Sequence, residues 1–248
     1  MLHLAALTSV VDSFLDPTEF FDVNFNGTWN VLRALRASTF AGRLLFVGSG
    51  DCYGAVREDE LPIVETQPLR PRSPYAVSKL AAEALCYQWS QTESFDIVMA
   101  RAFNHFGPGQ DARFAIASFA RQIARIRNGR SSPHIITGDL SVTRDLTDVR
   151  DVISAYIVLL EKGRPGEAYN VASGCERRLS NVLDEMLAIA DVDVEVVVDP
   201  AHVRAGEQRR AVADVHKIAS DTGWAATIPL ARSLADVLDD WNQRVNLE

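Results

Sequence analysis

The chain has 248 residues, of which 47% are hydrophobic and 23% are charged, and its formal net charge is −8. This length can bury a sizeable core as one large domain or two small ones. The acidic balance, with no Lys/Arg-rich block, argues against a surface for nucleic acid or anionic membranes, so an anionic ligand has to be bound by local arginines.

Cysteine and histidine spacings give no sign of a disulfide framework or a metal site. Cys52, Cys86 and Cys175 are odd in number and form no CxxC pattern, which is typical of core thiols in a reducing cytosol. The histidines lack the spacing of metal ligands. No apolar run reaches the length of a membrane span, and the start MLHLAAL lacks the features of a signal peptide. We therefore expect a soluble cytoplasmic protein that holds no metal.

Short apolar runs alternate with helical patterns through the first part of the chain. The expected elements are a strand ending at HLAAL (3–7), a helix over 17–38, a strand over RLLFVGS (43–49), a helix over 74–91 and a strand over FDIVMARAF (95–103). Strands separated by helices indicate parallel crossovers. The sequence therefore predicts an α/β fold with a doubly wound parallel sheet.

After residue 103 the alternation loosens. The expected elements are helices over 113–128, over 149–161, from Ser180 and from Leu230, and strands over 134–137, 167–173 and 194–198. This irregular texture is typical of a lobe added to a sheet, and no repeat or flexible linker marks a boundary.

The segment GSGDCYG (48–54) follows a predicted strand and has glycines spaced somewhat like those of a dinucleotide-binding turn. The residues after it, AVREDELPIVETQPLRPRS, are charged and rich in proline and have no apolar helical period. No helix N-terminus is therefore available to bind a pyrophosphate. We interpret the segment as a strand end that leads into a long loop at the carboxyl edge of the sheet, where ligands bind.

The stretch SPYAVSKLAAEAL (73–85) places one of only three lysines four residues after a tyrosine. Ser73 is a candidate N-cap and Pro74 the first helical residue, so Tyr75 and Lys79 share one helix face. With Ser49, they could bring a phenol, an ammonium and a hydroxyl together. A neighbouring ammonium lowers the pKa of a phenol, which can then exchange a proton with a carbonyl or alcohol oxygen. The spacing alone also fits a packed tyrosine, a solvated lysine and a turn-forming serine.

Several motifs in a fixed order resemble those of one enzyme family. They are HLAA, NFNGTWNVLRA, Ser49 followed by Tyr53-Gly54, PLRPRSPYAVSKLAAE, FNHFGPGQ and TRDLTDVRDV. Together they resemble the extended short-chain dehydrogenase/reductase family that acts on nucleotide sugars, and the resemblance covers essentially the whole chain. FNHFGPGQ and LTDVRD are more similar to GDP-4-keto-6-deoxy-D-mannose reductases than to GDP-mannose 4,6-dehydratases.

The resemblance implies a Rossmann-like cofactor domain and a smaller C-terminal substrate lobe. Residues 1–103 and 146–174 would form the cofactor domain, and residues 104–145 and 175–248 would form the substrate lobe.

The resemblance also implies roles at the reacting centre. Tyr75 would be the general acid, Lys79 would hold the nicotinamide ribose hydroxyls and lower the Tyr75 pKa, and Ser49 would hydrogen-bond the reacting oxygen. Ala5 and Ala6 would contact the cofactor, which is NADP(H) in the reductases and NAD(H) in other members.

For a nucleotide-diphosphate sugar, GDP-linked in the most similar members, the implied contacts are Ser49, Gly50, Asp51, Asn104, Arg144, Arg204 and Glu207. Arginines supply forked donors to a diphosphate. Asp51 stands where dehydratases keep a Glu that removes a proton, and it reads equally well as a solvated loop acid. At the nucleotide end, Leu146 and Ala205 depart from the family's aromatic and Pro.

Family members begin with a Gly-rich βαβ segment that binds the cofactor pyrophosphate, whereas this chain opens at MLHLAAL, which matches the family's fourth strand. The mononucleotide-binding half of the fold that contains this segment takes on the order of sixty residues. We favour a truncated reading frame over a lost function, because Ser49, Tyr75 and Lys79 are all present. With the first strands and the Gly-rich turn absent, we expect this chain to leave an apolar strand edge open and to bind NADP(H) weakly or not at all.

Two helices carry more apolar residues than one sheet face needs. These residues include Phe20, Phe21, Trp29, Leu85 and Trp89. The resemblance implies a homodimer through the helices over 17–38 and 74–91, and burial against loops of the same chain is the alternative.

Three functions stay open. They are an NADPH-dependent reductase of a GDP-4-keto-6-deoxyhexose, a dehydratase or 4-epimerase with tightly held NAD, and a non-catalytic relative that binds sugar nucleotides.

Overall fold

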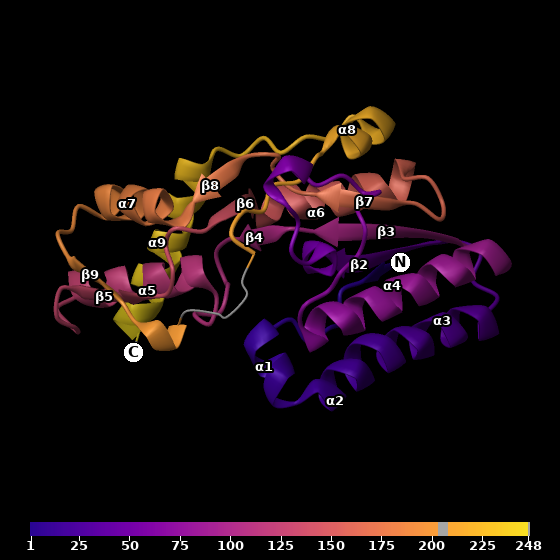
Figure 1. Cartoon of the computed structure of the whole chain (residues 1–248), viewed down its shortest axis with the longest axis horizontal. Helices are drawn as coiled ribbons and strands as arrows, with labels where there is room; N and C mark the ends of the chain where they lie inside the picture. Colours follow the sequence, from indigo (N-terminus) through magenta and orange to yellow (C-terminus); the bar gives the residue numbers. More distant parts are fainter. Residues whose placement is uncertain (203–207, 248) are drawn as a thin grey trace.

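Four parallel strands form the main sheet of the computed structural model, which describes residues 1–202 and 208–247 (Figure 1). Its order is β1 (Leu2–His3), β2 (Arg43–Ser49), β3 (Asp96–Ala102) and β7 (Ala168–Val171). Every neighbouring pair is parallel. The carboxyl ends of the strands therefore meet at one edge.

Helices cover both faces of the main sheet. On one face α4 (Pro74–Thr92) packs on β2 and β3, with α3 (Gly27–Ala37) beside it, and on the other lies α6 (Val149–Lys162). Leu44 and Phe46 pack toward α3 and α4, while Leu45 between them packs with α6. A strand buried on both faces reads as a continuous apolar run, as RLLFV does. The predicted α/β fold with a doubly wound parallel sheet is confirmed.

The helix predicted over 17–38 is interrupted. It consists of α2 (Pro17–Phe20), the π-helical segment η1 (Phe21–Asn26) and α3, and a further helix, α1 (Val10–Leu15), precedes it. The buried Asn24 side chain accepts a hydrogen bond from the Leu7 N–H (2.8 Å) and donates to the Leu7 carbonyl (3.0 Å) and to Ser78 Oγ (2.9 Å). The local change of helix type accompanies a polar tie between the segment after β1 and α4.

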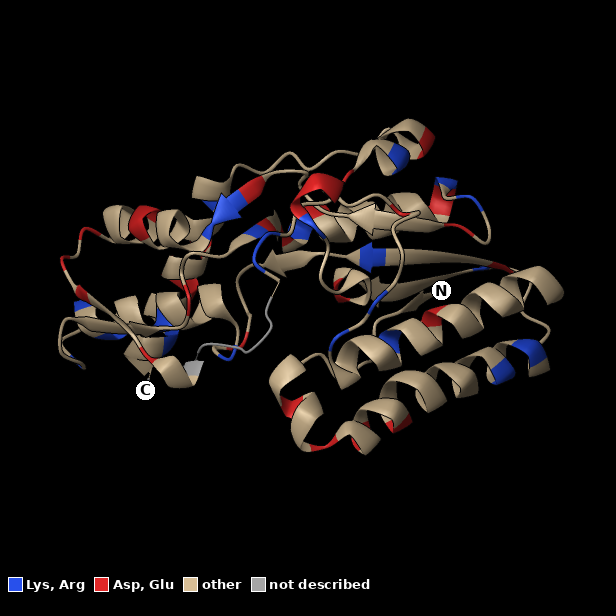
Figure 2. Cartoon of the chain, viewed as in Figure 1, with Lys and Arg blue, Asp and Glu red and all other residues tan. Residues whose placement is uncertain are grey.

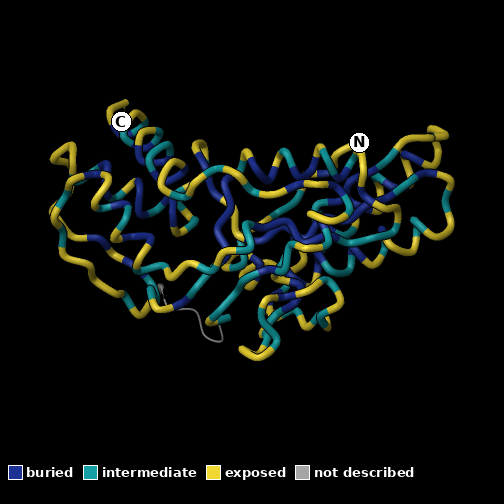
Figure 3. The backbone as a smooth tube through the Cα atoms, turned by 90° about the horizontal axis from the view of Figure 1, so that it is seen from above, coloured by how far each residue is buried: buried dark blue, intermediate teal, exposed yellow. Residues whose placement is uncertain are grey.

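The rest of the chain adds a C-terminal lobe built on helices and two small sheets. One sheet has the order β4 (Asn104–Phe106), β6 (Thr143–Asp148) and β8 (Glu176–Arg178), and the other pairs β5 (His134–Thr137) with β9 (Glu195–Val198). The helices α5 (Ala115–Arg127), α7 (Leu179–Ala190) and α9 (Leu230–Leu247) share a core that includes Ile123, Leu183 and Leu238. Figure 3 shows buried backbone running through the interior of both parts.

Several short elements lack a sequence pattern and were not predicted. They are α1, β4, β6, β8, α8 (His216–Thr222) and the 3-10 turns η2 (Gly50–Tyr53), η3 (Glu58–Glu60) and η4 (Pro200–His202). Ile218 of α8 and Trp224 pack into the core beneath the main sheet with Leu159. The predicted residue boundaries between the cofactor domain and the substrate lobe stay a proposal. Within the described residues, no helix combines the length and the apolar character needed to cross a bilayer.

Candidate active site

Ser49 is the last residue of β2 and pairs in register with Ala102 at the end of β3. The chain then turns through η2, as expected of a strand end that leads into a loop rather than into a helix. At Gly54 φ is +65°, and a Cβ there would lie 1.8 Å from the Arg70 carbonyl oxygen. Only glycine fits this crossing of the loop over itself, which brings residue 70 and the start of α4 back beside Ser49.

The start of α4 follows the sequence expectation. Ser73 is the N-cap, with its Oγ accepting a hydrogen bond from the Ala76 N–H (3.1 Å), and Pro74 is the first helical residue. This cap fixes the rotation of the helix, so Tyr75 and Lys79 both lie on its buried face and are only 8% and 5% exposed. The predicted helix face is therefore confirmed.

Tyr75 lies against Phe20 in an edge-to-face arrangement with 6.4 Å between ring centroids. Burial raises the pKa of the Tyr75 phenol, as does the negative charge of Asp51, while a hydrogen bond with Ser49 lowers it. Burial is the largest of these causes, and the expectation that Lys79 lowers the pKa of Tyr75 stays a prediction. The phenol therefore keeps its proton at neutral pH, as a proton donor requires.

The Lys79 ammonium lies over the Phe46 ring, 4.7 Å from its centroid. Burial lowers the pKa of Lys79 to about 8. Among the described residues, none forms a hydrogen bond or an ion pair with this ammonium, which is costly for a buried cation unless a ligand supplies oxygen acceptors. A pair of sugar hydroxyls would meet that need, so this position fits the ribose of a dinucleotide.

The segment after β1 runs out at the same edge of the sheet. His3 of β1 pairs in register with Phe46 of β2, so Ala5 and Ala6 follow the carboxyl end of β1 next to the end of β2. Ala5 is exposed and Ala6 half-buried. Small side chains at this edge leave room for a flat ligand to approach the backbone.

Ser49 and Asp51 share a local contact. The Asp51 N–H donates to Ser49 Oγ (3.2 Å), so the Ser49 hydroxyl keeps its own proton for a further acceptor. The Asp51 residue is exposed, and its charge acts on the Tyr75 pKa. At Gly50 a Cβ would lie 3.0 Å from the Phe103 ring, so a larger residue would displace that ring. The structure thus brings Ser49, Gly50, Asp51 and Tyr75 together.

Asn104 and Arg144 lie further along the same edge, in the C-terminal lobe. Asn104 begins β4 and pairs with Leu146 of β6, two residues after Arg144. The half-buried Arg144 guanidinium donates to the carbonyls of Thr143 (2.7 Å) and Gln208 (2.9 Å). Leu146, the departure from the family's aromatic, packs into the lobe core. Arg204, Ala205 and Glu207 lie outside the described residues.

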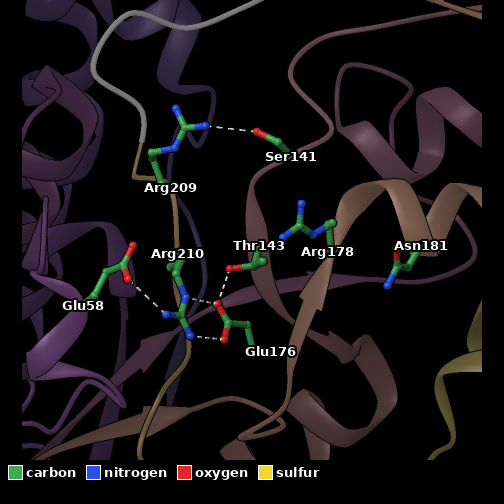
Figure 4. A pocket seen from close by; sticks show the side chains of 8 residues that line it. All are labelled: Glu58, Ser141, Thr143, Glu176, Arg178, Asn181, Arg209 and Arg210. Atoms are coloured by element: carbon green, nitrogen blue, oxygen red, sulfur yellow. Dashed lines mark hydrogen bonds and ion pairs between the residues drawn. The ribbon is translucent and has the colours of Figure 1, made fainter.

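A second feature of the lobe is a pocket of about 520 Å³ that sequence analysis did not predict (Figure 4). Its lining residues are Glu58, Ser141, Thr143, Glu176, Arg178, Asn181, Arg209 and Arg210. Arg210 pairs with Glu176 (2.7 Å) and with Glu58 (3.4 Å), which joins β8 to η3. Arg210 thereby lowers the pKa of Glu176 to about 2. Thr143 and Arg144 are successive residues of β6, so their side chains point to opposite faces of the strand. The pocket therefore lies on the face of β6 that carries Thr143, and Arg144 lies on the other face.

Sequence reasoning also missed Glu83 and Arg101, which are buried and form an ion pair. The available signal was the four-residue repeat of Tyr75, Lys79 and Glu83 along one helix face. Elsewhere acidic and basic residues are interspersed along the chain, apart from β8, which is largely basic (Figure 2). Within the described part of the chain, no three His, Cys, Asp or Glu side chains cluster as metal ligands.

The geometry supports proton transfer to an oxygen held at the Ser49 end of the main sheet. It combines a buried, protonated phenol, a serine hydroxyl beside it, and a cation without an acceptor in the described protein. Comparisons with known proteins show the family of the chain.

The family model described as GDP-mannose 4,6 dehydratase matches residues 1–237. GDP-6-deoxy-D-mannose reductase of Pseudomonas aeruginosa is 46% identical over 248 residues, which are 100% of this chain and 82% of that protein.

Solved structures agree with this likeness. The structure of RMD from Pseudomonas aeruginosa complexed with NADPH superposes with a TM-score of 0.94 at 46% identity, covering 98% of this chain and 81% of that one. UDP-N-acetylglucosamine 4-epimerase from Methanobrevibacter ruminantium M1, in complex with UDP-N-acetylmuramic acid, has a TM-score of 0.87 at 25% identity, covering 98% and 76%.

Proposed function

Because the chain belongs to the GDP-mannose 4,6 dehydratase family, within the extended short-chain dehydrogenases/reductases that act on nucleotide sugars, we propose that it is an NADPH-dependent reductase. Its substrate would be a GDP-linked 4-keto-6-deoxyhexose, with the conversion of GDP-4-keto-6-deoxy-D-mannose to GDP-D-rhamnose as the type reaction.

One observation carries this proposal, the meeting of Ser49, Tyr75 and Lys79 at the carboxyl edge of the main sheet. The choice of reductase over dehydratase is supported by the likeness to the Pseudomonas aeruginosa reductase. It is also supported by Asp51, whose carboxylate reaches less far than the Glu that dehydratases keep at this position.

In the proposed reaction, Ser49 and Tyr75 act on the keto oxygen. The Ser49 hydroxyl donates a hydrogen bond to that oxygen and holds the carbonyl in one orientation. Tyr75 then gives its proton to the oxygen as negative charge develops there, and burial keeps the phenol protonated until that moment. When bound, NADPH supplies the hydride.

Lys79, Ala5 and Ala6 would hold the cofactor. The buried ammonium of Lys79 would bind ribose hydroxyls, and its charge would favour the phenolate left after proton transfer. NAD(H) could occupy the same position in a dehydratase or epimerase.

The sugar nucleotide would extend from Ser49, Gly50 and Asp51 toward Asn104 and Arg144, with Arg204 and Glu207 as further candidates. The Arg144 guanidinium would bind the diphosphate, because its forked N–H donors match phosphate oxygens.

The test uses the 248-residue chain with GDP-4-keto-6-deoxy-D-mannose and NADPH at high concentration. Loss of NADPH absorbance that depends on the ketosugar, together with a GDP-deoxyhexose product on chromatography, supports the reductase. Turnover of GDP-mannose with no added reductant would instead show a dehydratase. Binding of GDP without any turnover would show a non-catalytic relative.

We also propose that two copies pair through the helical segments over 17–38 and 74–91, which contain α3 and most of α4, and that the protein works in the cytoplasm. Trp29 of α3 is 45% exposed, although Phe20 is buried and Trp89 is half-buried. Trp29 and Trp89 line a hollow of about 740 Å³ on the outer face of these helices, together with Arg33 and Arg36. A second copy would cover this mixed aromatic and basic surface.

A further inference from the structure

Glu83 of α4 and Arg101 of β3 form an ion pair inside the protein. Arg101 Nη2 lies 2.6 Å from Glu83 Oε1, and Arg101 Nε donates to both carboxylate oxygens at 3.0 and 3.2 Å. The Arg101 side chain is only 8% exposed and the Glu83 side chain only 6%. A forked contact of this kind fixes the position and the orientation of the carboxylate.

Arg101 is itself held from other sides. Its Nη1 donates to Tyr53 Oη (2.9 Å) and to the Glu65 carbonyl (2.8 Å), and Tyr53 donates to Asn170 Oδ1 (2.6 Å). The network therefore joins α4, β3, β7 and the loop after β2. At Gly48 a Cβ would lie 3.0 Å from Glu83 Oε2, so the carboxylate packs tightly against β2.

Glu83 lies one helical turn after Lys79 and two turns after Tyr75, on the same buried face. Four titratable groups interact electrostatically with Lys79. They are His3 of β1, Cys52 of η2, and Cys86 and Glu83 of α4. Burial raises the pKa of the Cys52 thiol to about 12 and also raises that of Cys86, so both are neutral at pH 7. Burial lowers the pKa of His3, which is therefore neutral as well. Glu83 is the anion that remains in this set.

We propose that Glu83 is a positioning residue of the active site: clamped by Arg101, its carboxylate fixes the buried face of α4 against the sheet and supplies the negative charge that keeps the Lys79 ammonium protonated. A carboxylate held by its own arginine cannot swing over to pair with Lys79. It stabilises the ammonium through space and leaves the N–H donors free for the cofactor.

The directions of the pKa shifts agree with this geometry. Burial lowers the pKa of Lys79 to about 8, while Cys52, Cys86 and, with the smallest effect of the three, Glu83 raise it. Without Glu83 the pKa would fall further, so a larger share of Lys79 would be neutral at pH 7. The meaning for catalysis rests on the proposed function, but the charge of Lys79 can be measured without substrate or cofactor.

The experiment follows the titration of Lys79 by NMR in protein labelled with 13C at lysine Cε. The chain has only Lys79, Lys162 and Lys217, so Lys162→Arg and Lys217→Arg assign the three signals. In Glu83→Gln we expect the Lys79 midpoint to fall by about one pH unit. Glu93→Gln is the matched control, because it removes a carboxylate at the other end of α4 that pairs with Arg36 at 3.7 Å. In Glu93→Gln the Lys79 midpoint should equal that of the parent protein.

A second variant covers the case in which Glu83→Gln does not fold, since breaking a buried pair leaves Arg101 unpaired. Glu83→Gln combined with Arg101→Met removes both charges and restores an uncharged interior. The loss of the Arg101 cation opposes the loss of the Glu83 anion, so the proposal requires a downward shift of the Lys79 midpoint that is smaller than in Glu83→Gln. A purely structural pair would leave the midpoint at the parent's value. An unchanged midpoint in the folded variants overturns it. A shift in a protein that does not reduce the ketosugar would contradict only the proposed function.

Discussion

The Lys79 ammonium lies 4.7 Å from the centroid of the Phe46 ring and has no hydrogen-bond acceptor among the described residues. The ring face offers a weak attraction for the cation, worth up to about 2 kcal/mol when water is excluded. This is less than the cost of burying the charge, as the lowered pKa of Lys79 shows. Lys79 is therefore held at the expense of stability, as expected for a residue that serves a ligand.

We predict that Lys79→Met stabilises the chain at pH 7, by on the order of 2 kcal/mol in the free energy of unfolding. The folded-state pKa is about 8 and the ordinary value is 10.5, so the parent gains stability as the pH rises from about 8 to 10.5 and the variant does not. Urea unfolding at pH 7 and pH 10 measures the difference, with Lys162→Met as the control. A variant less stable than the parent at pH 7 would refute this view of Lys79.

Ser49→Ala should lower kcat for ketosugar reduction by about 10- to 100-fold, because the reacting oxygen loses a donor. The affinity for GDP, measured by calorimetry, should stay within about twofold, since the nucleotide would lie toward Arg144. A proportionate loss of GDP affinity would place Ser49 in binding rather than in catalysis.

Asn24→Ala should destabilise the fold by about 2–3 kcal/mol, because three hydrogen bonds to Leu7 and Ser78 are lost and their partners stay buried. The matched control is Asn26→Ala, which removes only an exposed contact with Asp22 (2.8 Å). Thermal unfolding of both variants tests the difference. Equal losses would mean that the π-helical segment needs no polar tie.

The main sheet was predictable because its strands and helices carry strong, regular patterns. RLLFVGS is apolar on both faces, and Ser73 with Pro74 marks the start of α4. The short strands of the C-terminal lobe were not predictable in the same way. Thr143–Asp148 reads TRDLTD and gains its strand form from pairing with β4 and β8, which no local pattern records.

The proposed site was predictable in its members but not in its electrostatics. The spacing of Tyr75 and Lys79 gave the shared face, yet it also suggested that Lys79 lowers the Tyr75 pKa. The structure shows burial outweighing charge at both residues. The clamp of Glu83 by Arg101 joins residues of α4 and β3, so its existence depended on the fold rather than on local sequence.

The proposed dimer predicts that Trp29→Glu yields a monomer without loss of folding, because the side chain is 45% exposed in the single chain. Ile153→Glu on α6, where the side chain is 49% exposed, is the control and should leave the association unchanged. Light scattering measures both. A parent that is a monomer at micromolar concentration would argue against pairing through these helices.

The central claim is that Tyr75 gives its proton to a keto sugar, and Tyr75→Phe tests it most directly. The chain and the variant are compared for NADPH oxidation that depends on GDP-4-keto-6-deoxy-D-mannose, with GDP affinity measured in parallel. We predict that the variant loses activity by about 10²- to 10⁴-fold and keeps its affinity for GDP. A variant that reduces the ketosugar as fast as the parent would contradict the account.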